Sequence, residues 1–209
     1  MKIIFATHNQ KKITELMELF LGLSVEFLSM DDVGIADDPA EDGSTLQEMA
    51  AKKALFIAEK IKGEEWVLAE NSGIFIKALG DEPGAFSDRW LGEGVPGEKL
   101  ASFTLARMKP VPSEERSAYF ECVMALIEPK NGKLVSFTGK VNGMLSEEAR
   151  GNADRTFPYD TIFVPEGSGG KTFAELTDDE KNGISHRARA AEQVQSFLIE
   201  RGLLHSSEE

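Results

Sequence analysis

The sequence lacks several features that would point to particular classes of protein. Cys122 is the only cysteine among 209 residues, so no disulfide can form within the chain, and we expect a reducing compartment, the cytoplasm. The apolar run at the N-terminus is too short for the core of a signal peptide. No stretch approaches the roughly 18 apolar residues of a membrane span, so we expect a soluble protein.

Basic residues are scarce relative to acidic ones. The chain carries 23 Lys and Arg against 36 Asp and Glu, a net charge of −13. A phosphate backbone or an anionic membrane attracts a clustered positive surface, so neither nucleic acid nor membrane is expected as a partner. A small anionic substrate stays compatible with this charge if the few basic side chains converge on one site.

Apolar patterning predicts strands that alternate with helices and are then followed by a hairpin. The long helix after Ser44 should begin with a capping box, because Glu48 follows Thr45 by three residues. Asn131-Gly132 between two apolar runs predicts a hairpin, and the polar run 70–73 should break a strand. The expected strands are 3–6, 25–28, 66–69, 74–79, 117–127, 134–141 and 162–164, and the expected helices are one after residue 12, then 45–61, 97–108 and 185–203. This order indicates an α/β fold with a mixed sheet.

Two polar clusters lie where an expected helix begins. The segment from Thr7 to Lys12 could bind an anion, because helix N–H groups and a lysine favour negative charge; a helix cap followed by solvated lysines is the alternative. In the acidic run before the long helix, Glu41 could bind Mg²⁺, which takes one or two carboxylates plus substrate phosphates. Acidic residues that only complement the helix N-terminus are the alternative there.

Two further clusters have residue types suited to a nucleotide site. The segment 70–73, Glu-Asn-Ser-Gly, interrupts apolar strand material, where polar groups are costly to bury; a turn or bulge explains part of it. A later group combines aromatic rings that could stack on a purine with cations that could hold phosphates. Taken singly, Phe157 would be typical of a buried core and Arg187 of an exposed surface. Its members are Phe157, Tyr159, Asp160, Lys171, Lys181, His186 and Arg187.

In their order along the chain, these motifs resemble the inosine triphosphate pyrophosphatase family of nucleotide-pool cleaning enzymes. The similarity runs from residue 1 to about residue 200, and the ordered set is specific although each motif alone is weak. The matching residues are Thr7, Asn9, Lys12 and Glu15, then Glu41, Gly43, Thr45 and Glu48, then Ser72-Gly73, Pro83-Gly84, Ser87 and Arg89, then Phe157 and Tyr159-Asp160, then 171–175 and Ser185-His186-Arg187.

The resemblance implies a two-lobed α/β fold, with an elongated mixed sheet flanked by helices and an active site in the cleft between the lobes. Residues 1–209 would form this one domain, with about 203–209 as a flexible tail, and the chain would form a homodimer. Members of the family hydrolyse ITP, dITP and XTP to the monophosphate and pyrophosphate, and they need Mg²⁺. The chain would therefore be a cytoplasmic hydrolase of nucleotide metabolism.

The resemblance also assigns residues to the parts of a site. Two N–H donors at the six-position of the base would favour a keto oxygen over the amino group of adenine. Phe157 would stack on the base, and His186 and Arg187 would reach its six-position oxygen. Tyr159 and Asp160, in the same loop as Phe157, would also bind the substrate. The rest of the substrate would be bound by Thr7, Asn9, Lys12, Ser72, Lys171 and Lys181, and the metal by Glu41 and Asn71. Catalysis would involve position 71 and Lys12.

Asn71 departs from the family pattern, which has a catalytic aspartate before Ser-Gly that activates water and contacts the metal. A neutral amide accepts no proton at useful pH, and losing such a base commonly costs about 10²–10⁴-fold in rate. Asn71 is then an engineered replacement that traps a substrate complex, a natural residue with Glu70 as the substitute base, or the mark of a nucleotide-binding protein without catalysis. Strand alternation points Glu70 away from Asn71.

The base-binding loop is a second departure. Thr156 and Pro158 replace both glycines of the family's loop. Proline fixes φ at about −65° and cannot copy the angles that glycine permits. The loop must therefore differ in shape, which makes a pyrophosphatase of altered base preference an alternative function.

Overall fold

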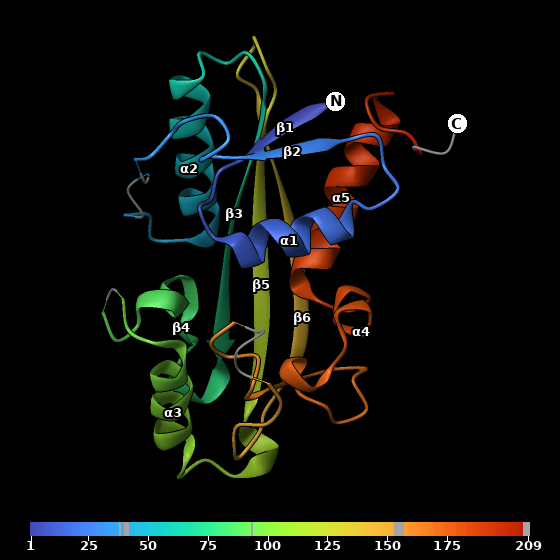
Figure 1. Ribbon diagram of the computed structural model, residues 1–209. Coiled ribbons are helices and arrows are strands. Elements are labelled where there is room, and N and C mark those ends of the chain that lie inside the picture. The colour runs from blue at the N-terminus through green and yellow to red at the C-terminus, as the bar shows by residue number, and fades with distance from the viewer. Residues whose placement is uncertain (38, 40–41, 93, 153–156, 207–209) are drawn as a thin grey trace. The chain divides into compact units, whose positions relative to one another are not determined.

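A mixed seven-stranded β-sheet runs through the part of the chain that the structure describes (Figure 1). This computed structural model describes residues 1–37, 39, 42–92, 94–152 and 157–206. The strands follow the order β2-β1-β3-β5-β6-β7, and β4 pairs with β3. The strands are β1 (Lys2–Phe5), β2 (Glu26–Ser29), β3 (Trp66–Ile76), β4 (Glu82–Pro83), β5 (Ser117–Ile127), β6 (Leu134–Leu145) and β7 (Phe163–Pro165). The main helices are α1 (Gln10–Leu19), α2 (Leu46–Lys60), α3 (Gly97–Met108), α4 (Asp178–Asn182) and α5 (His186–Glu200). The expected α/β fold with a mixed sheet is confirmed.

Polar side chains determine where the first two helices begin. Asn9 caps α1, because its side chain accepts hydrogen bonds from two backbone N–H groups in the first turn. Thr45 caps α2 by accepting a hydrogen bond from the N–H of Glu48, which is one of the two hydrogen bonds of the predicted capping box. The Glu48 carboxylate accepts hydrogen bonds from the backbone N–H and the hydroxyl of Ser44, so Ser44 and Thr45 both contribute to the start of α2.

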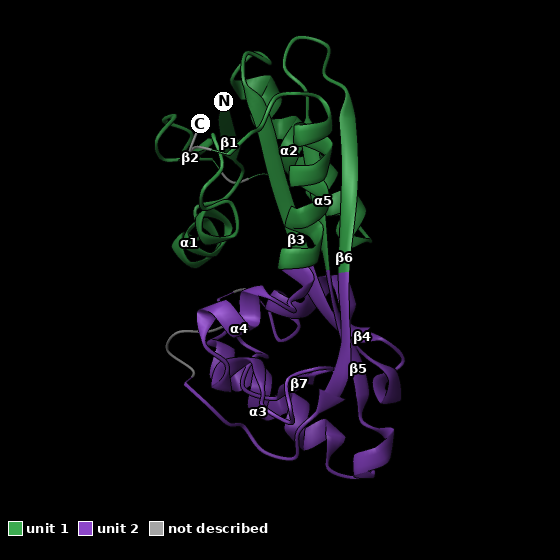
Figure 2. Cartoon of the chain, turned by 90° about the vertical axis from the view of Figure 1, so that its right-hand side faces the viewer, with its two compact units in different colours: residues 1–71, 122–139, 188–209 green, residues 72–121, 140–187 purple. Residues whose placement is uncertain are grey.

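The chain divides into two compact units, which Figure 2 colours separately. The first unit comprises residues 1–71, 122–139 and 188–209. In it, β1 lies between β2 and β3 and is parallel to both. Helices α2 and α5 lie on opposite sides of these strands (Figure 1). Strand residues pack with α1 and α5 in a buried core that includes Ile3, Phe5, Leu16, Phe20, Leu68, Val194 and Leu198.

The second unit comprises residues 72–121 and 140–187. Its strand pairs β3–β4 and β6–β7 are antiparallel, and its core includes Ile74, Leu100, Met108, Phe120, Val141, Phe163 and Phe173. Gly73 on β3 approaches the chain so closely that a Cβ there would lie 2.2 Å from the carbonyl oxygen of Gly84. The next residue, Ile74, donates its N–H to the Ser87 hydroxyl at 2.8 Å. Glycine at position 73 therefore permits this close backbone approach.

The polar segment 70–73 does not break the strand, so that expectation from the sequence is wrong. β3 is continuous from Trp66 to Ile76. The extended backbone continues because the buried side chains of Glu70 and Asn71 find polar partners on neighbouring helices, which offsets their desolvation. Strand β6 likewise continues beyond residue 141, where its end was expected, to Leu145.

The turn between β5 and β6 forms at the Asn131-Gly132 pair, as predicted. The Glu128 N–H donates to the carbonyl oxygen of Lys133 at 2.9 Å, which closes the turn. Gly132 has a φ of 65°, a backbone angle that glycine adopts without strain. The local sequence signal located the turn, and the loop has a distant contact as well, from the Lys130 N–H to the Gly63 carbonyl oxygen at 2.8 Å.

At the C-terminal end, Leu204 is buried in the core of the first unit. The Ser24 N–H also donates to the carbonyl oxygen of His205 at 2.9 Å, and residues 207–209 of the expected tail lie outside the described residues. No helix in the described parts of the chain has both the length and the apolar character that crossing a bilayer requires.

Candidate active site

In the first unit, Glu70 of β3 takes part in a buried ion pair. Lys12 Nζ, from the first turns of α1, lies 2.8 Å from Glu70 Oε1, and the Glu70 side chain is 1% exposed. Cys122 Sγ on β5 donates to Glu70 Oε2 at 3.5 Å. The Asn9 cap fixes the start of α1, and the Asn9 N–H donates to Thr7 Oγ1 at 3.1 Å. The segment from Thr7 to Lys12, which was predicted to bind an anion, therefore positions Lys12 beside the buried Glu70 carboxylate, and the lysine charge stabilises that carboxylate.

Asn71 meets a different set of side chains, all from α2. Lys53 Nζ donates to Asn71 Oδ1 at 3.4 Å, and Asn71 Nδ2 donates to Met49 Sδ at 2.9 Å. Both Lys53 and Asn71 are buried. Successive residues of a strand point to opposite faces, so Glu70 faces Lys12 while Asn71 faces α2. The structure does not bring the Glu70 carboxylate and the Asn71 amide together.

In the second unit, cations surround the ring of Phe157. Lys181 Nζ lies 5.1 Å from the ring centroid, and the Arg187 guanidinium carbon lies 4.8 Å from it. Asp160 Oδ2 accepts hydrogen bonds from the Phe157 N–H at 3.1 Å and from Lys181 Nζ at 3.0 Å. Four of the residues expected to bind the substrate therefore form one connected group, with Phe157 as its most exposed member.

His186, the first residue of α5, packs against two aromatic rings. Its imidazole stacks on Phe120 at a centroid distance of 4.7 Å and an interplanar angle of 13°. Phe173 flanks it at 6.2 Å, and His186 is 4% exposed. Phe120 was missed as a site residue. The alternation of strand 117–127 indicates only that Phe120 is a core side chain, and no sequence spacing links it to His186.

Two other expected site residues, Tyr159 and Lys171, have polar partners of their own, whereas the Ser72 hydroxyl has none among the described residues. Tyr159 donates its hydroxyl to the Ser87 carbonyl oxygen at 2.7 Å; burial, helped by nearby Asp88, raises the pKa of Tyr159 well above its usual range, so the phenol stays protonated. Lys171 Nζ forms an exposed pair with Glu180 at 2.9 Å. The buried Ser72 Oγ has no hydrogen-bond partner among the described residues.

The expected metal site is only partly described. Glu41, the expected carboxylate ligand, and Thr156 of the base-binding loop lie outside the described residues. Within the described ranges, no three His, Cys, Asp or Glu side chains gather in a group that could hold a metal ion. Of the two expected metal ligands, Asn71 is the one within the described residues. Its side-chain oxygen already accepts a hydrogen bond from Lys53.

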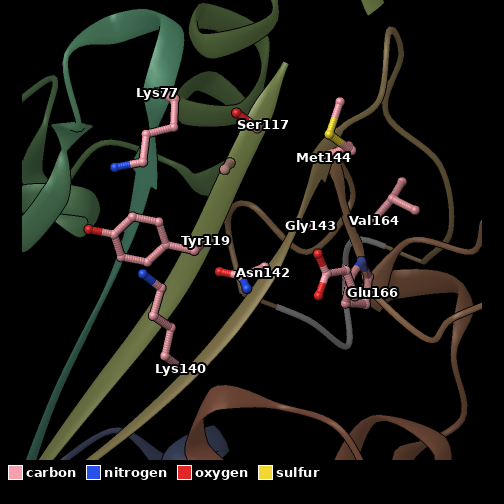
Figure 3. A pocket seen from close by; sticks show the side chains of 11 residues that line it. Lys77, Ser117, Tyr119, Lys140, Asn142, Gly143, Met144, Val164 and Glu166 are labelled. Carbon is pink, nitrogen blue, oxygen red and sulfur yellow. The ribbon is translucent and has the colours of Figure 1, made fainter. Parts of the chain in front are cut away.

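A separate pocket of about 420 Å³ lies in the second unit (Figure 3). Lys77 and Lys140 approach the ring of Tyr119, with Nζ atoms 5.0 and 3.5 Å from its centroid. Tyr119 also stacks on Phe75 at 4.7 Å. Asn142, Met144 and Glu166 complete much of the lining (Figure 3). None of the residues that the sequence assigned to a site lines this pocket.

The fold and these groups define a mixed α/β protein in which lysine and arginine side chains gather beside an aromatic ring and a buried carboxylate. Such groups are suited to a small ligand with an aromatic ring and negative charge. The model of the Ham1 family matches residues 3–197, so the chain belongs to the Ham1 family. Together with relatives named dITP/XTP pyrophosphatase, this match confirms the resemblance to the inosine triphosphate pyrophosphatase family.

Individual relatives agree with this assignment. The chain is 40% identical over 201 residues to a dITP/XTP pyrophosphatase of Thermoanaerobacter sp. (strain X514), covering 96% of this chain and 98% of the relative. A dITP/XTP pyrophosphatase of Bacillus subtilis (strain 168) is 35% identical over 195 residues, or 93% and 96% of the two chains. Among solved structures, a HAM1 protein from Coxiella burnetii superposes with a TM-score of 0.84 at 35% identity, covering 96% of this chain and 99% of that one.

Proposed function

We propose that this chain is a nucleoside-triphosphate pyrophosphatase that acts on the deaminated purine nucleotides ITP, dITP and XTP. Water would attack the α-phosphorus, the bond from that phosphorus to the bridging oxygen would break, and pyrophosphate would leave with the nucleoside monophosphate as the other product. Relatives of similar length that carry the name dITP/XTP pyrophosphatase support this activity. The observation that carries the proposal is the group formed by Phe157, Lys181 and Arg187.

This group has the chemistry needed to select a purine with a keto oxygen at position six. Phe157 would stack on the base, while His186 and Arg187 would donate hydrogen bonds to that oxygen. Adenine presents an amino group there, which is itself a donor, so paired donors would reject it. Two more residues, Tyr159 and Asp160, would complete the base site, chiefly by holding its loop through the hydrogen bonds described above.

The phosphates would be bound by lysine side chains together with hydroxyl and amide groups. Lys12 and Lys171 would supply positive charge, and each is now paired with a glutamate that a phosphate would replace or share. The remaining contacts would come from Thr7, Asn9, Ser72 and Lys181. The Ser72 hydroxyl is suited to this role because it is buried and has no partner among the described residues.

We also propose that Mg²⁺ is the metal, bound by Glu41 and Asn71. Mg²⁺ binds through one or two carboxylates together with substrate phosphates, and the described residues contribute only the neutral Asn71 oxygen, beside the Lys53 cation. This donor set fits the ion only when the triphosphate supplies further oxygens. When bound, Mg²⁺ would neutralise charge on the phosphates. We therefore expect Mg²⁺ to bind with the nucleotide and only weakly without it.

Asn71 should make the reaction slow, because it cannot take the proton of the attacking water. The three explanations for Asn71 stay in competition. Glu70 as substitute base has to act from a side chain that is 1% exposed and paired with Lys12. A nucleotide-binding protein without catalysis is the second candidate function, and the amide at position 71 is the observation that favours it. Altered base preference through Pro158 is a third outcome.

The oligomeric state and location complete the proposal. We propose a cytoplasmic homodimer that binds neither nucleic acid nor membranes. Cys122 is the only cysteine of the sequence, so no disulfide forms within the chain, which fits a reducing compartment. The net charge of −13 disfavours polyanionic partners. Light scattering coupled to size-exclusion chromatography measures the dimer directly, and a monomeric mass would contradict that part.

Pyrophosphate release from ITP, XTP, dGTP and ATP with Mg²⁺ tests the proposed activity, and calorimetric binding of the same nucleotides runs in parallel. We expect ITP or XTP to be turned over fastest, and Arg187→Gln to reduce the ITP-to-ATP ratio of kcat/KM. Tight ITP binding without turnover would favour the non-catalytic alternative. Neither binding nor turnover of any purine triphosphate would refute the proposed function.

A further inference from the structure

The Asn71 side chain sits between two residues of α2 that offer it different chemistry. Met49 and Lys53 are four residues apart and therefore lie on one face of the helix. Met49 Sδ accepts a hydrogen bond from Asn71 Nδ2 at 2.9 Å, and Lys53 Nζ donates one to Asn71 Oδ1 at 3.4 Å. The exposed fractions of the three residues are 0% for Met49, 8% for Lys53 and 5% for Asn71.

The Lys53 ammonium can donate to an amide oxygen or to a carboxylate oxygen, but the Met49 side of these surroundings matches only the amide. An amide has N–H donors on one side and an acceptor oxygen on the other, whereas an ionised carboxylate has acceptors only. A thioether sulfur has no hydrogen to donate. Aspartate at position 71 would therefore place a charged oxygen against the Met49 sulfur with no hydrogen between them, in a site with little access to water.

We infer that Met49 and Asn71 form a matched pair, in which Met49 is a positioning residue that orients the carboxamide with its oxygen toward Lys53. Aspartate is then accepted at position 71 only when residue 49 carries a hydrogen-bond donor. The amide nitrogen of asparagine occupies the same place along the side chain as the methionine sulfur, so Met49→Asn supplies that donor. The inference deepens the proposed function, and its catalytic consequence rests on that function, whereas the pairing itself does not.

A double-mutant cycle on the full chain, without metal or nucleotide, tests the pairing through the thermal midpoint. Asn71→Asp alone should lower the midpoint by about 5 °C, because a buried polar atom loses its partner. Met49→Asn with Asn71→Asp should regain most of that loss. Met49→Leu with Asn71→Asp is the matched control: leucine keeps the volume but supplies no donor, so it should regain nothing. Additive effects across the cycle, or an Asn71→Asp protein as stable as the original, would overturn the inference.

Turnover of ITP with Mg²⁺ by the same variants gives the second readout. We expect the Met49→Asn, Asn71→Asp protein to be at least about 10-fold faster than the Asn71→Asp protein, since its carboxylate is held in place. Equal rates for the two would contradict the positioning role of residue 49. If the cycle shows coupling but no variant hydrolyses any purine triphosphate, the proposed function fails while the matched pair stands.

Discussion

Replacing Asp160 with asparagine removes the negative charge of this residue and keeps nearly the same shape. The Asp160 carboxylate is 2% exposed and lies 3.0 Å from Lys181 Nζ, and the same oxygen accepts the N–H of Phe157. Removing one partner of a buried ion pair costs about 3–5 kcal/mol. Asparagine keeps an acceptor for the N–H of Phe157, and Lys181 keeps its contacts with the Phe157 and Phe173 rings, so we expect the lower end, about 3 kcal/mol.

For a chain of this length, a loss of that size lowers the thermal midpoint by about 6–12 °C. Differential scanning calorimetry of Asp160→Asn measures it, with Asp81→Asn as the matched control. Asp81 pairs with Lys77 at 2.9 Å in the same unit, but both side chains are about half exposed, and such pairs contribute about 0–1 kcal/mol.

Adding Lys181→Met to Asp160→Asn removes the buried cation whose carboxylate partner has been replaced. We expect this double variant to regain part of the lost stability, because a buried pair replaced by neutral groups is often close to neutral overall. Equal midpoints for Asp160→Asn and Asp81→Asn would refute the reasoning, since burial would then make no difference to the pair.

Three further changes probe other contacts. Hydrogen bonds from the Ser44 hydroxyl and N–H hold the pKa of Glu48 below its ordinary value. The stability that Glu48 contributes is therefore present above about pH 4.5 and lost as the pH falls further. Glu48→Gln should make the thermal midpoint depend less on pH between pH 3 and 5. Phe120→Leu should lower the ITP-to-ATP ratio of kcat/KM by about 10-fold by freeing the His186 ring, and Phe120→Tyr should restore the ratio. Lys12→Met should lower the midpoint of urea unfolding because it removes the cation that pairs with the buried Glu70 carboxylate, and an unchanged midpoint would contradict the importance of that pair.

Local sequence signals predicted the elements whose formation depends on neighbouring residues. Thr45 and Glu48 marked the start of α2, and Asn131-Gly132 marked the hairpin between β5 and β6. The helix predicted over 97–108 coincides with α3. Caps and tight turns depend on hydrogen bonds between residues a few positions apart, which is why sequence alone was sufficient for them.

The continuity of β3 could not be predicted from local signals. Polar residues at 70–73 favoured a break, yet the strand continues to Ile76. The burial of Glu70 and Asn71 is compensated by lysines from two different helices distant in the sequence, Lys12 and Lys53. A prediction from neighbouring residues alone therefore includes the cost of burying the polar groups but not the distant partners that offset this cost.

The sequence by itself determined the family, through motifs in a specific order. Given an extended backbone at residues 70 and 71, alternation along a strand also predicts that Glu70 and Asn71 point to opposite faces. Only the tertiary structure decided what each of them meets: a cation on α1 for one, and a sulfur and a cation on α2 for the other. The same holds for His186, whose stacking partner Phe120 comes from a distant strand. Such contacts depend on how helices pack on the sheet, which residue spacing along the chain does not specify.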